Sequence, residues 1–405
     1  MDFLTAALTY ILPFLFVLTI VVTIHEFGHF LTAKWCGVAI DRFSIGFGRA
    51  IASWRDRSGV EWRIGWMPLG GYVRFKGDDN AASLPDSSDL YALRRAIAET
   101  EGEAAVNRYF HFKPLWQRAL VVAAGPIANF ILAIVLFAAI LMAFGERIIP
   151  ARVDSVQAGS PAAAAGFKAG DVVVEAAGRR IDGFLDLQRI IMLRAGSPVE
   201  FVVQRGGGEV ALIATPERRT ITDEAGDTHR VGVLGVQISQ RPGDLQLRRY
   251  GPIEAVGAGA ERTWQVLDTT VGYLGRIVTG KENGDQLGGP LRIAKVSGDV
   301  AKISSSVEDV ALAERMLAMF VALLSLTAVL SIGIGFMNLL PVPVLDGGHL
   351  LFYAYEAVAR RPVSAVVQAA GYRIGLALLI GLMLFATWND LTQLRVFQFF
   401  GGLLS

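Results

Sequence analysis

The chain lacks several features on which many enzymes and secreted domains depend. It has a single cysteine, Cys36, so it can form no internal disulfide and no cysteine-rich zinc site. Its formal net charge is only +1, which gives no indication of a nucleic-acid partner. Only five of its 405 residues are histidines, so a metal site would need imidazoles supplemented by carboxylates. We expect Cys36 to be an inert, packed thiol.

Apolar residues, by contrast, are abundant. They make up 53% of the sequence and give a mean hydropathy of +0.44. Long apolar runs near both ends flank a middle of ordinary soluble composition. This division predicts a membrane protein with a sizeable extramembrane part.

The first apolar run contains the pattern H-E-x-x-H, at His25-Glu26-Phe27-Gly28-His29. On a helix, residues i and i+4 share a face, so both imidazoles can bind one metal ion. Glu26 follows the first histidine, where it can act as general base on a metal-bound water without binding the metal. The alternative is a chance match or a packed histidine pair. Ionisable groups inside an apolar span are costly, however, and usually functional.

A third ligand is expected at the end of a later apolar run. Residues 315–340 are followed by Pro341 and Pro343, which break the helix, and then by Asp346. A broken helix at membrane depth is tolerated where it lines a cavity. A hydrolytic zinc takes three protein ligands and a water, and Asp346 is the candidate third ligand. His349 is the competitor, with packing or a hydrogen bond behind the ligand as its other role.

Four transmembrane helices are predicted, at residues 4–33, 118–143, 315–340 and 371–387. Lys34, Arg42 and Arg49 follow the first, so the positive-inside rule makes that end cytoplasmic. His25 precedes Lys34 by roughly 14 Å along a helix, which predicts a site inside the bilayer, nearer the cytoplasm. Alternation of the spans brings Asp346 to the same side.

Two polar regions separate these runs. Residues 42–79 read as strands, and the apolar tip Met67–Tyr72 could enter the membrane and pair with an extended substrate. The alternative is a plain cytoplasmic hairpin. The region 148–240 contains Ser160-Pro161-Ala162 and, further on, Gly170-Asp171, a pattern that resembles a PDZ domain. It would bind peptides by strand addition, or act only as a steric plug.

The predicted fold class is a polytopic α-helical membrane protein with four transmembrane helices, a membrane-associated β-hairpin region and an inserted PDZ-like α+β domain. The predicted parts are a first transmembrane helix with H-E-x-x-H (1–41), a membrane-associated β-sheet or loop (42–79), a cytoplasmic loop with a helix (80–117), a second transmembrane helix (118–146), a periplasmic PDZ-like domain (148–240), an amphipathic periplasmic segment (241–314), a third transmembrane helix with L-D-G (315–350), a cytoplasmic loop (351–370), and a fourth transmembrane helix with a C-terminal tail (371–405).

Three stretches resemble the signatures of the site-2 protease family of intramembrane zinc metalloproteases. Within that family they resemble the bacterial regulator-of-sigma-E proteases. They are His25–His29, Gly125–Asn129 and Asn338–Gly348. The resemblance implies Zn²⁺ held by His25, His29 and Asp346, with Glu26 as the base. The candidate substrate-binding residues are Asn338, Gly70, Gly71 and Asn129.

The resemblance also implies the substrates and the location. Substrates would be single-span membrane proteins already trimmed on the outer side, such as anti-sigma factors or remnant signal peptides. The protein would be a multi-pass protein of the bacterial inner membrane, with the lipid bilayer and not nucleic acid as its partner. Its active site would face the cytoplasm, and its PDZ-like domain the periplasm. Enterobacterial members carry two tandem PDZ domains, whereas only one copy is recognisable here.

Two functions of other classes remain open from the residues alone. One is a membrane scaffold whose metal site is structural and closed by a fourth ligand, for example His349. The other is a metal transporter, which would spread acidic and histidine ligands across the bilayer. Here they gather on one side.

Overall fold

A computed structural model of the chain describes residues 3–77, 87–222, 228–238, 246–280, 288–305 and 311–393. The predicted boundaries at 79, 80, 240 and 241, and the predicted tail up to 405, fall outside these ranges. The chain forms two compact units. The first comprises Met1–Ile140 together with Ile253–Ser405, and the second is Leu141–Pro252.

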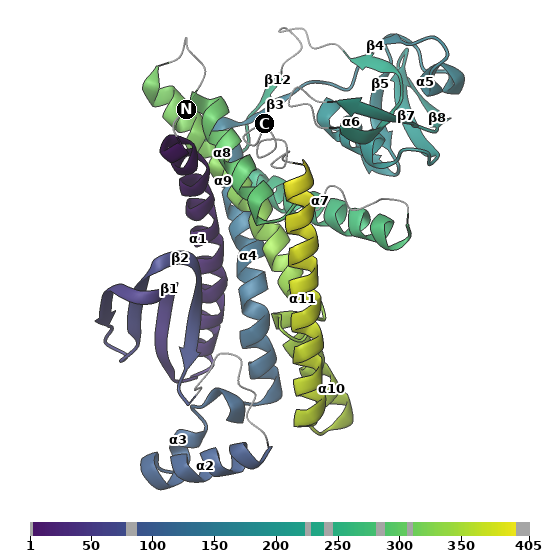
Figure 1. Cartoon of the computed structure of the whole chain (residues 1–405). Helices are drawn as coiled ribbons and strands as arrows, with labels where there is room; N and C mark the ends of the chain where they lie inside the picture. Colours follow the sequence, from purple (N-terminus) through teal and green to yellow (C-terminus); the bar gives the residue numbers. More distant parts are fainter. Residues whose placement is uncertain are drawn as a thin grey trace, which may run out of the picture. The chain divides into compact units, whose positions relative to one another are not determined.

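Long apolar helices run side by side in the first unit (Figure 1). They are α1 (Phe3–Trp35), α4 (Leu115–Phe144), α9 (Leu312–Leu339) and α11 (Ala365–Gln393). Within the described ranges these four are long and apolar enough to cross a membrane, with candidate spans of 28 or 30 residues. At about 1.5 Å per residue, each exceeds a hydrocarbon core of about 30 Å. The four predicted transmembrane helices are confirmed.

Small residues let α4 and α9 approach closely. Ala133 and Phe137 of α4 pack with Ala328 and Ile332 of α9 in one buried cluster. Beside it, the Ser331 hydroxyl donates a hydrogen bond of 2.8 Å to a backbone carbonyl oxygen of α4. Helices in lipid gain little from the hydrophobic effect, so close packing and such hydrogen bonds hold them together.

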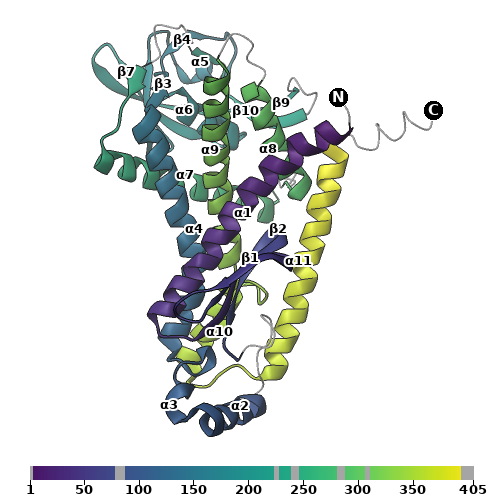
Figure 2. The ribbon, with the colours of Figure 1, turned by 90° about the vertical axis from the view of Figure 1, so that its left-hand side faces the viewer.

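A twisted sheet lies against α1 (Figure 2). Its strands, β1 (Ile40–Arg55) and β2 (Glu61–Phe75), both bend, so residues 42–45 pair with 61–64 on one side and with 71–74 on the other. Phe43 is therefore central, between Trp62 and Val73. Its ring packs 5.3 Å from that of Phe30 on α1. Within the described residues, 71–75 pair with β1 on one side only, so they form an edge strand of this sheet.

The third membrane helix ends at Leu339, and after six intervening residues a new helix, α10 (Asp346–Ala359), begins. The two glycines after Asp346 make this compact break possible. A Cβ on Gly347 would lie 2.3 Å from the Leu339 carbonyl oxygen, and one on Gly348 would lie 2.3 Å from the Val342 carbonyl oxygen. Only glycine fits such contacts. Residues 351–370, predicted as a loop, are helical up to Ala359 and again from Ala365.

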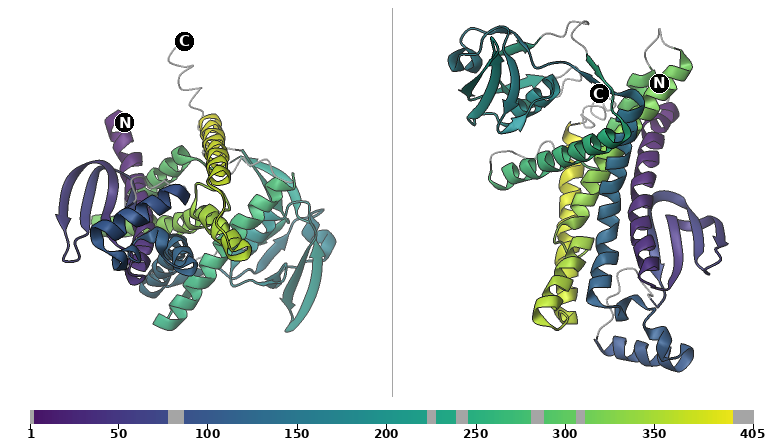
Figure 3. Two further views of the ribbon diagram at one scale, coloured as in Figure 1. Left: turned by 90° about the horizontal axis from the view of Figure 1, so that it is seen from below. Right: turned by 180° about the vertical axis from the view of Figure 1, so that it is seen from behind.

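Short helices lie at the same end of the first unit as α10 (Figure 3). They are α2 (Ser87–Glu101), α3 (Glu103–Val106) and the 3₁₀ turn η1 (Phe110–Phe112). Gly102 separates α2 from α3 with a φ of 88°. Lys76 at the end of β2 pairs with Glu101 at 2.8 Å, which ties the sheet to α2. This pairing raises the pKa of Lys76 and lowers that of Glu101.

Two helices complete the first unit, α7 (Pro252–Val278) and α8 (Pro290–Ser305). Asp390 near the end of α11 is buried, and its carboxylate accepts hydrogen bonds from the backbone N–H groups of Gly289 and Arg292. The carboxylate thus caps the first turn of α8, where unpaired N–H groups favour an anion. This contact fastens the end of α11, most of whose span is not buried within the protein.

The second unit is β-rich. Its described elements are β3 (Glu146–Ile148), β4 (Val153–Val156), α5 (Pro161–Ala165), β5 (Val172–Ala176), β6 (Arg179–Arg180), α6 (Phe184–Leu193), β7 (Val199–Arg205), β8 (Gly208–Ala214), β9 (Glu217–Thr222), β10 (Thr228–Val233), β11 (Val236–Ile238) and β12 (Gln246–Arg248). The largest sheet has the order β6-β5-β7-β8. The buried Asp171 accepts two hydrogen bonds of 2.7 Å from Arg205, which hold the pKa of its carboxyl below the usual value.

We predict that Gly259→Ala destabilises the first unit, because its Cβ would lie 2.7 Å from the Ile134 carbonyl oxygen of α4. Such overpacking costs about 1–3 kcal/mol. Thermal unfolding of the detergent-solubilised chain measures the effect. Gly257→Ala in the same helix is the matched control, because its Cβ would meet open space. Equal melting temperatures for the two variants would contradict the packing described here.

Candidate metal centre

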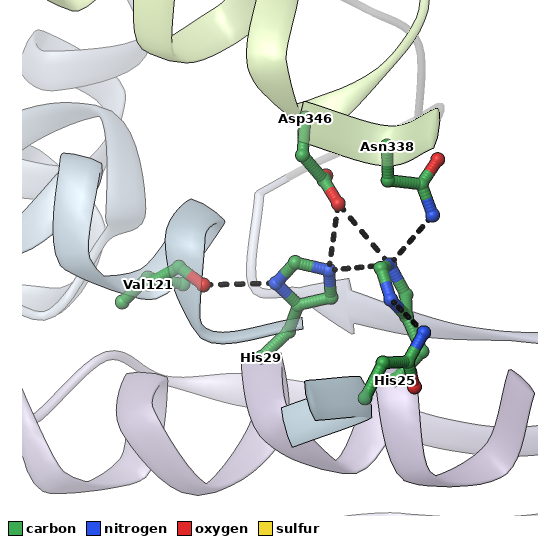
Figure 4. Close-up of polar contacts among 6 residues, drawn as sticks. His25, His29, Val121, Asn338 and Asp346 are labelled. Atoms are coloured by element: carbon green, nitrogen blue, oxygen red, sulfur yellow. Dashed lines mark hydrogen bonds and ion pairs between the residues drawn. The ribbon is translucent and has the colours of Figure 1, made fainter. Parts of the chain in front are cut away.

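Two imidazoles project from one face of α1, as the i, i+4 spacing requires (Figure 4). The Nε2 atoms of His25 and His29 lie 3.2 Å apart. His25 is 7% exposed, and the two rings meet edge to face with centroids 4.8 Å apart. Two ring nitrogens this close can bind one metal ion.

Asp346, the first residue of α10, brings a carboxylate to the same point. Its Oδ2 lies 3.1 Å from Nε2 of His25 and 3.6 Å from Nε2 of His29. Two ligand atoms on a tetrahedral zinc are about 3.4 Å apart, given bonds of about 2.0–2.1 Å. Among the described residues, His25, His29 and Asp346 form a group that could hold a metal ion. Each offers one ligand atom, and these three atoms lie within 4.8 Å of one another.

The carboxylate oxygen at the centre of this group has no hydrogen-bond partner, although it is buried. A buried anion without a partner is costly, and a cation at this point would satisfy it. The donor set of two imidazoles and one carboxylate is typical of a hydrolytic zinc. The residues therefore fit the metal.

Backbone and side-chain groups of α4 orient both rings. Nδ1 of His29 lies 2.8 Å from the Val121 carbonyl oxygen, which can only accept, so Nδ1 carries the proton and Nε2 keeps its lone pair. The amide of Asn129 lies 3.2 Å from Nδ1 of His25. Asn129 Oδ1 is buried without a partner. Turning the amide by 180° lets Oδ1 accept from Nδ1 and frees Nε2 of His25 for the metal.

Gly125 gives the rings their space. A Cβ at this position would lie 2.3 Å from Nε2 of His29 and 2.8 Å from Cε1 of His25. Any side chain at position 125 would push the imidazoles away from α4. The Gly125-Pro126 pair of the second span thus has a direct steric relation to the two histidines of the first.

A cavity of about 560 Å³ opens beside the group. Its lining includes Glu26, Asn338 and Gly71 besides the three ligand-bearing residues. Glu26 lies beside the edge strand, since a Cβ on Gly71 would lie 3.3 Å from its Cγ. Asn338 reaches in from the last turn of α9, with Nδ2 3.4 Å from Nε2 of His25. A carboxylate, an amide donor and open space thus lie next to the metal ligands.

Three further residues from the sequence analysis lie outside the group of three ligand-bearing side chains. Asn129 is fully buried behind His25 and is not among the residues that line this cavity. Gly70, with a φ of 157°, faces Phe47, whose ring a Cβ would meet at 2.3 Å. His349 lines the cavity, but its Nε2 lies 3.0 Å from the Tyr372 hydroxyl, and it is outside the group of three.

Sequence reasoning missed several groups that hold the site. The Val121 carbonyl is a backbone group, which leaves no mark in the sequence. Gly125 stood in a motif, but its steric role becomes visible only where α1 and α4 meet. The ion pair between Arg118 and Glu356 joins residues 238 positions apart, and no periodicity connects them.

Membrane-spanning helices around a group of two histidines and one aspartate define the class of membrane-embedded metallopeptidases. The sequence matches the family model of peptidase family M50 over residues 13–382, and the chain belongs to this family, which is the site-2 protease family. It is therefore a zinc metalloprotease of the membrane. The predicted family, enzyme class and cofactor are confirmed.

Its relatives carry matching names. The chain is 50% identical over 393 residues to metalloprotease MmpA of Caulobacter vibrioides, covering 96% of this chain and 97% of that one. It is 43% identical over 386 residues to Atu1380 of Agrobacterium fabrum, whose name describes a zinc metalloprotease, covering 95% and 96%.

Among solved structures, part of the chain resembles the PDZ domain of an SdrC-like protein from Listeria monocytogenes. The likeness covers 22% of this chain and 87% of that one, at 20% identity and a TM-score of 0.19. A score this low establishes no common fold, so the PDZ-like domain stays a prediction.

We predict that Asp346→Asn and His25→Ala abolish stoichiometric zinc binding, because each removes one of three converging ligand atoms. His349→Ala, the matched control for the competing ligand, should keep its zinc. Metal content of the purified full chain, measured by atomic emission, distinguishes them. Zinc lost from His349→Ala but retained in Asp346→Asn would reverse the assignment of the third ligand.

Proposed function

We propose that this protein cleaves single-span membrane proteins within or near their transmembrane helix, with His25, His29 and Asp346 holding zinc and Glu26 as general base. The observation that carries the proposal is the orphaned carboxylate oxygen of Asp346 between two imidazoles, beside a cavity that also contains Glu26. Anti-sigma factors and remnant signal peptides are the proposed substrates.

The chain's own residues divide the chemistry between them. Zinc, when bound, supplies Lewis-acid chemistry that makes water acidic near neutral pH and polarises a carbonyl group. Glu26 takes the proton from the attacking water and returns it to the leaving amine. Asn338 Nδ2 donates to the scissile carbonyl oxygen as negative charge develops there.

A helical substrate must unwind first, because its carbonyl groups are engaged in its own hydrogen bonds. The edge strand 71–75 offers a place for the unwound segment. Gly71 brings this strand against the active site, since a Cβ there would lie 3.3 Å from Cγ of Glu26. We propose that the substrate adds to this edge as an extended strand, with Gly71 rather than Gly70 as its closest neighbour. The sheet itself is proposed to lie in the membrane surface.

Orientation follows from charge. Lys34, Arg42 and Arg49 follow the first span, and Arg360, Arg361 and Arg373 lie near the start of the fourth. Under the positive-inside rule these segments face the cytoplasm of a bacterium and the second unit faces the periplasm. The second unit is proposed to be the PDZ-like domain. Its cavity of about 290 Å³, between α6 and residues 231–237, is the proposed peptide groove.

A closed structural site, as in a scaffold, is the less favoured reading. It would require a fourth protein ligand, and His349 instead contacts Tyr372. A transporter would need ligands along a path across the bilayer. Within the described residues, the ligand-bearing group of three lies at one point.

We expect Glu26→Gln to keep its zinc and to lose cleavage of a membrane-spanning reporter by at least about 10²-fold, because the amide cannot accept a proton. Cleavage in proteoliposomes and the zinc content of the same preparation are measured together. Normal turnover by the variant would rule out Glu26 as the base, whereas loss of zinc would instead make it a ligand.

Helix-destabilising residues in the reporter should speed its cleavage. Replacing two leucines near the cut by glycine lowers helix propensity by about 1 kcal/mol each and eases unwinding. The same replacements one helical turn outside the bilayer are the control. Equal rates for both reporters would contradict binding in an extended form.

A further inference from the structure

We propose that the ion pair between Arg118 and Glu356 is a positioning device for the metal centre: it locks α10, which carries Asp346, onto α4, which orients both imidazoles. The inference rests on the metal site of the proposed function. Neither residue is a ligand or a catalytic residue, and both act through Asp346.

The metal centre is assembled from two parts of the fold. The imidazoles of α1 are oriented by α4, through the Val121 carbonyl and Asn129. The carboxylate comes from the first residue of α10, after a break in the chain. The distance between ligands therefore depends on how α10 is held against α4. Metal coordination tolerates deviations of only about 0.2 Å.

Arg118 holds α10 at two points. A terminal guanidinium nitrogen donates to Glu356 Oε1 at 2.6 Å, and the guanidinium carbon lies 5.0 Å from the centre of the Tyr353 ring. Tyr353 and Glu356 are three residues apart, on one face of α10. Arg118 Nε also donates to the Lys113 carbonyl oxygen at 3.2 Å, just before α4 begins. The guanidinium group is thus held both by α10 and by the residue just before α4.

The pair is partly shielded from water. The side chains of Arg118 and Glu356 are 17% and 22% exposed, and both line the cavity that contains the metal ligands. Shielded charge pairs are screened less by salt than surface pairs. A directional, charge-assisted hydrogen bond fixes the helix more narrowly than apolar contacts do. The apolar contacts here are Leu350 and Tyr353, which pack against the cluster of Val121 and Phe110.

The pair lies far enough from Asp346 along α10 to restrain the tilt of that helix. Glu356 lies ten residues after Asp346, about 15 Å along the helix. At the other end of α10, residues 340–345 form the non-helical connection to α9. A helix held only at this connection can tilt, and a tilt moves the carboxylate relative to the imidazoles. The Arg118–Glu356 pair restrains this tilt at the far end.

The test compares the zinc affinity of the full chain in detergent, by chelator competition, for wild type, Arg118→Gln, Glu356→Gln and the reversed pair Arg118→Glu/Glu356→Arg. Each single variant should bind zinc about 10-fold more weakly, as for other residues that orient metal ligands. The reversed pair should recover most of the affinity. The visible spectrum of the Co²⁺-loaded protein should change in the single variants and return in the reversed pair.

Lys76→Gln is the matched control. It breaks the 2.8 Å pair with Glu101, which lies in the same unit but joins the sheet to α2 instead of α10 to α4. Its zinc affinity and Co²⁺ spectrum should equal those of wild type. Wild-type affinity and spectrum in Arg118→Gln would overturn the proposal, as would equal losses in Lys76→Gln.

Thermal unfolding and gel filtration separate positioning from folding. If the single variants do not fold, a folded reversed pair with wild-type affinity supports the proposal, and a folded reversed pair with weak affinity overturns it. Misfolding of every variant, the reversed pair included, would show a general structural role and also overturns it. His25→Ala tests the proposed function separately, because undiminished zinc there removes the metal site whatever Arg118 does.

Discussion

Three ligand atoms from two distant parts of the chain meet within a few ångströms inside a bundle of apolar helices. His25 and His29 come from the first span, and Asp346 comes from the break after the third. Their mutual approach leaves a buried carboxylate oxygen without a hydrogen-bond partner. Burying such a group is unfavourable unless a cation joins it. The surrounding helices and the sheet hold these three side chains together despite that unfavourable free energy.

The neighbouring elements each restrain the positions of these three side chains. The second span removes a side chain at Gly125 and supplies acceptors for the outer ring nitrogens. The break between α9 and α10 needs two glycines to turn the chain so sharply. The sheet against α1 brings Gly71 and an open strand edge next to Glu26. Restraints from different elements all act on the same few atoms, as a preorganised site requires.

The loosest part of the bundle is the fourth span. Only 6% of its apolar window is buried within the protein, and buried Asp390 fastens one end of it to α8. At the other end, Tyr372 contacts His349 one turn beyond Asp346. A helix held mainly at its ends leaves its middle to lipid. This arrangement suits an enzyme whose substrates arrive from the bilayer.

The sequence by itself predicted the group of three ligand-bearing residues and the four spans. A helix places residues i and i+4 on one face, and apolar runs of this length have few alternatives to crossing a membrane. It also indicated Asp346, because prolines break the third helix just before it. Tertiary structure alone decided that Asn129 backs His25 instead of lining the cavity, that His349 contacts Tyr372, and that Arg118 meets Glu356. These contacts join residues between 23 and 238 positions apart. Local periodicity carries no information about such pairs, since they depend on how whole helices pack.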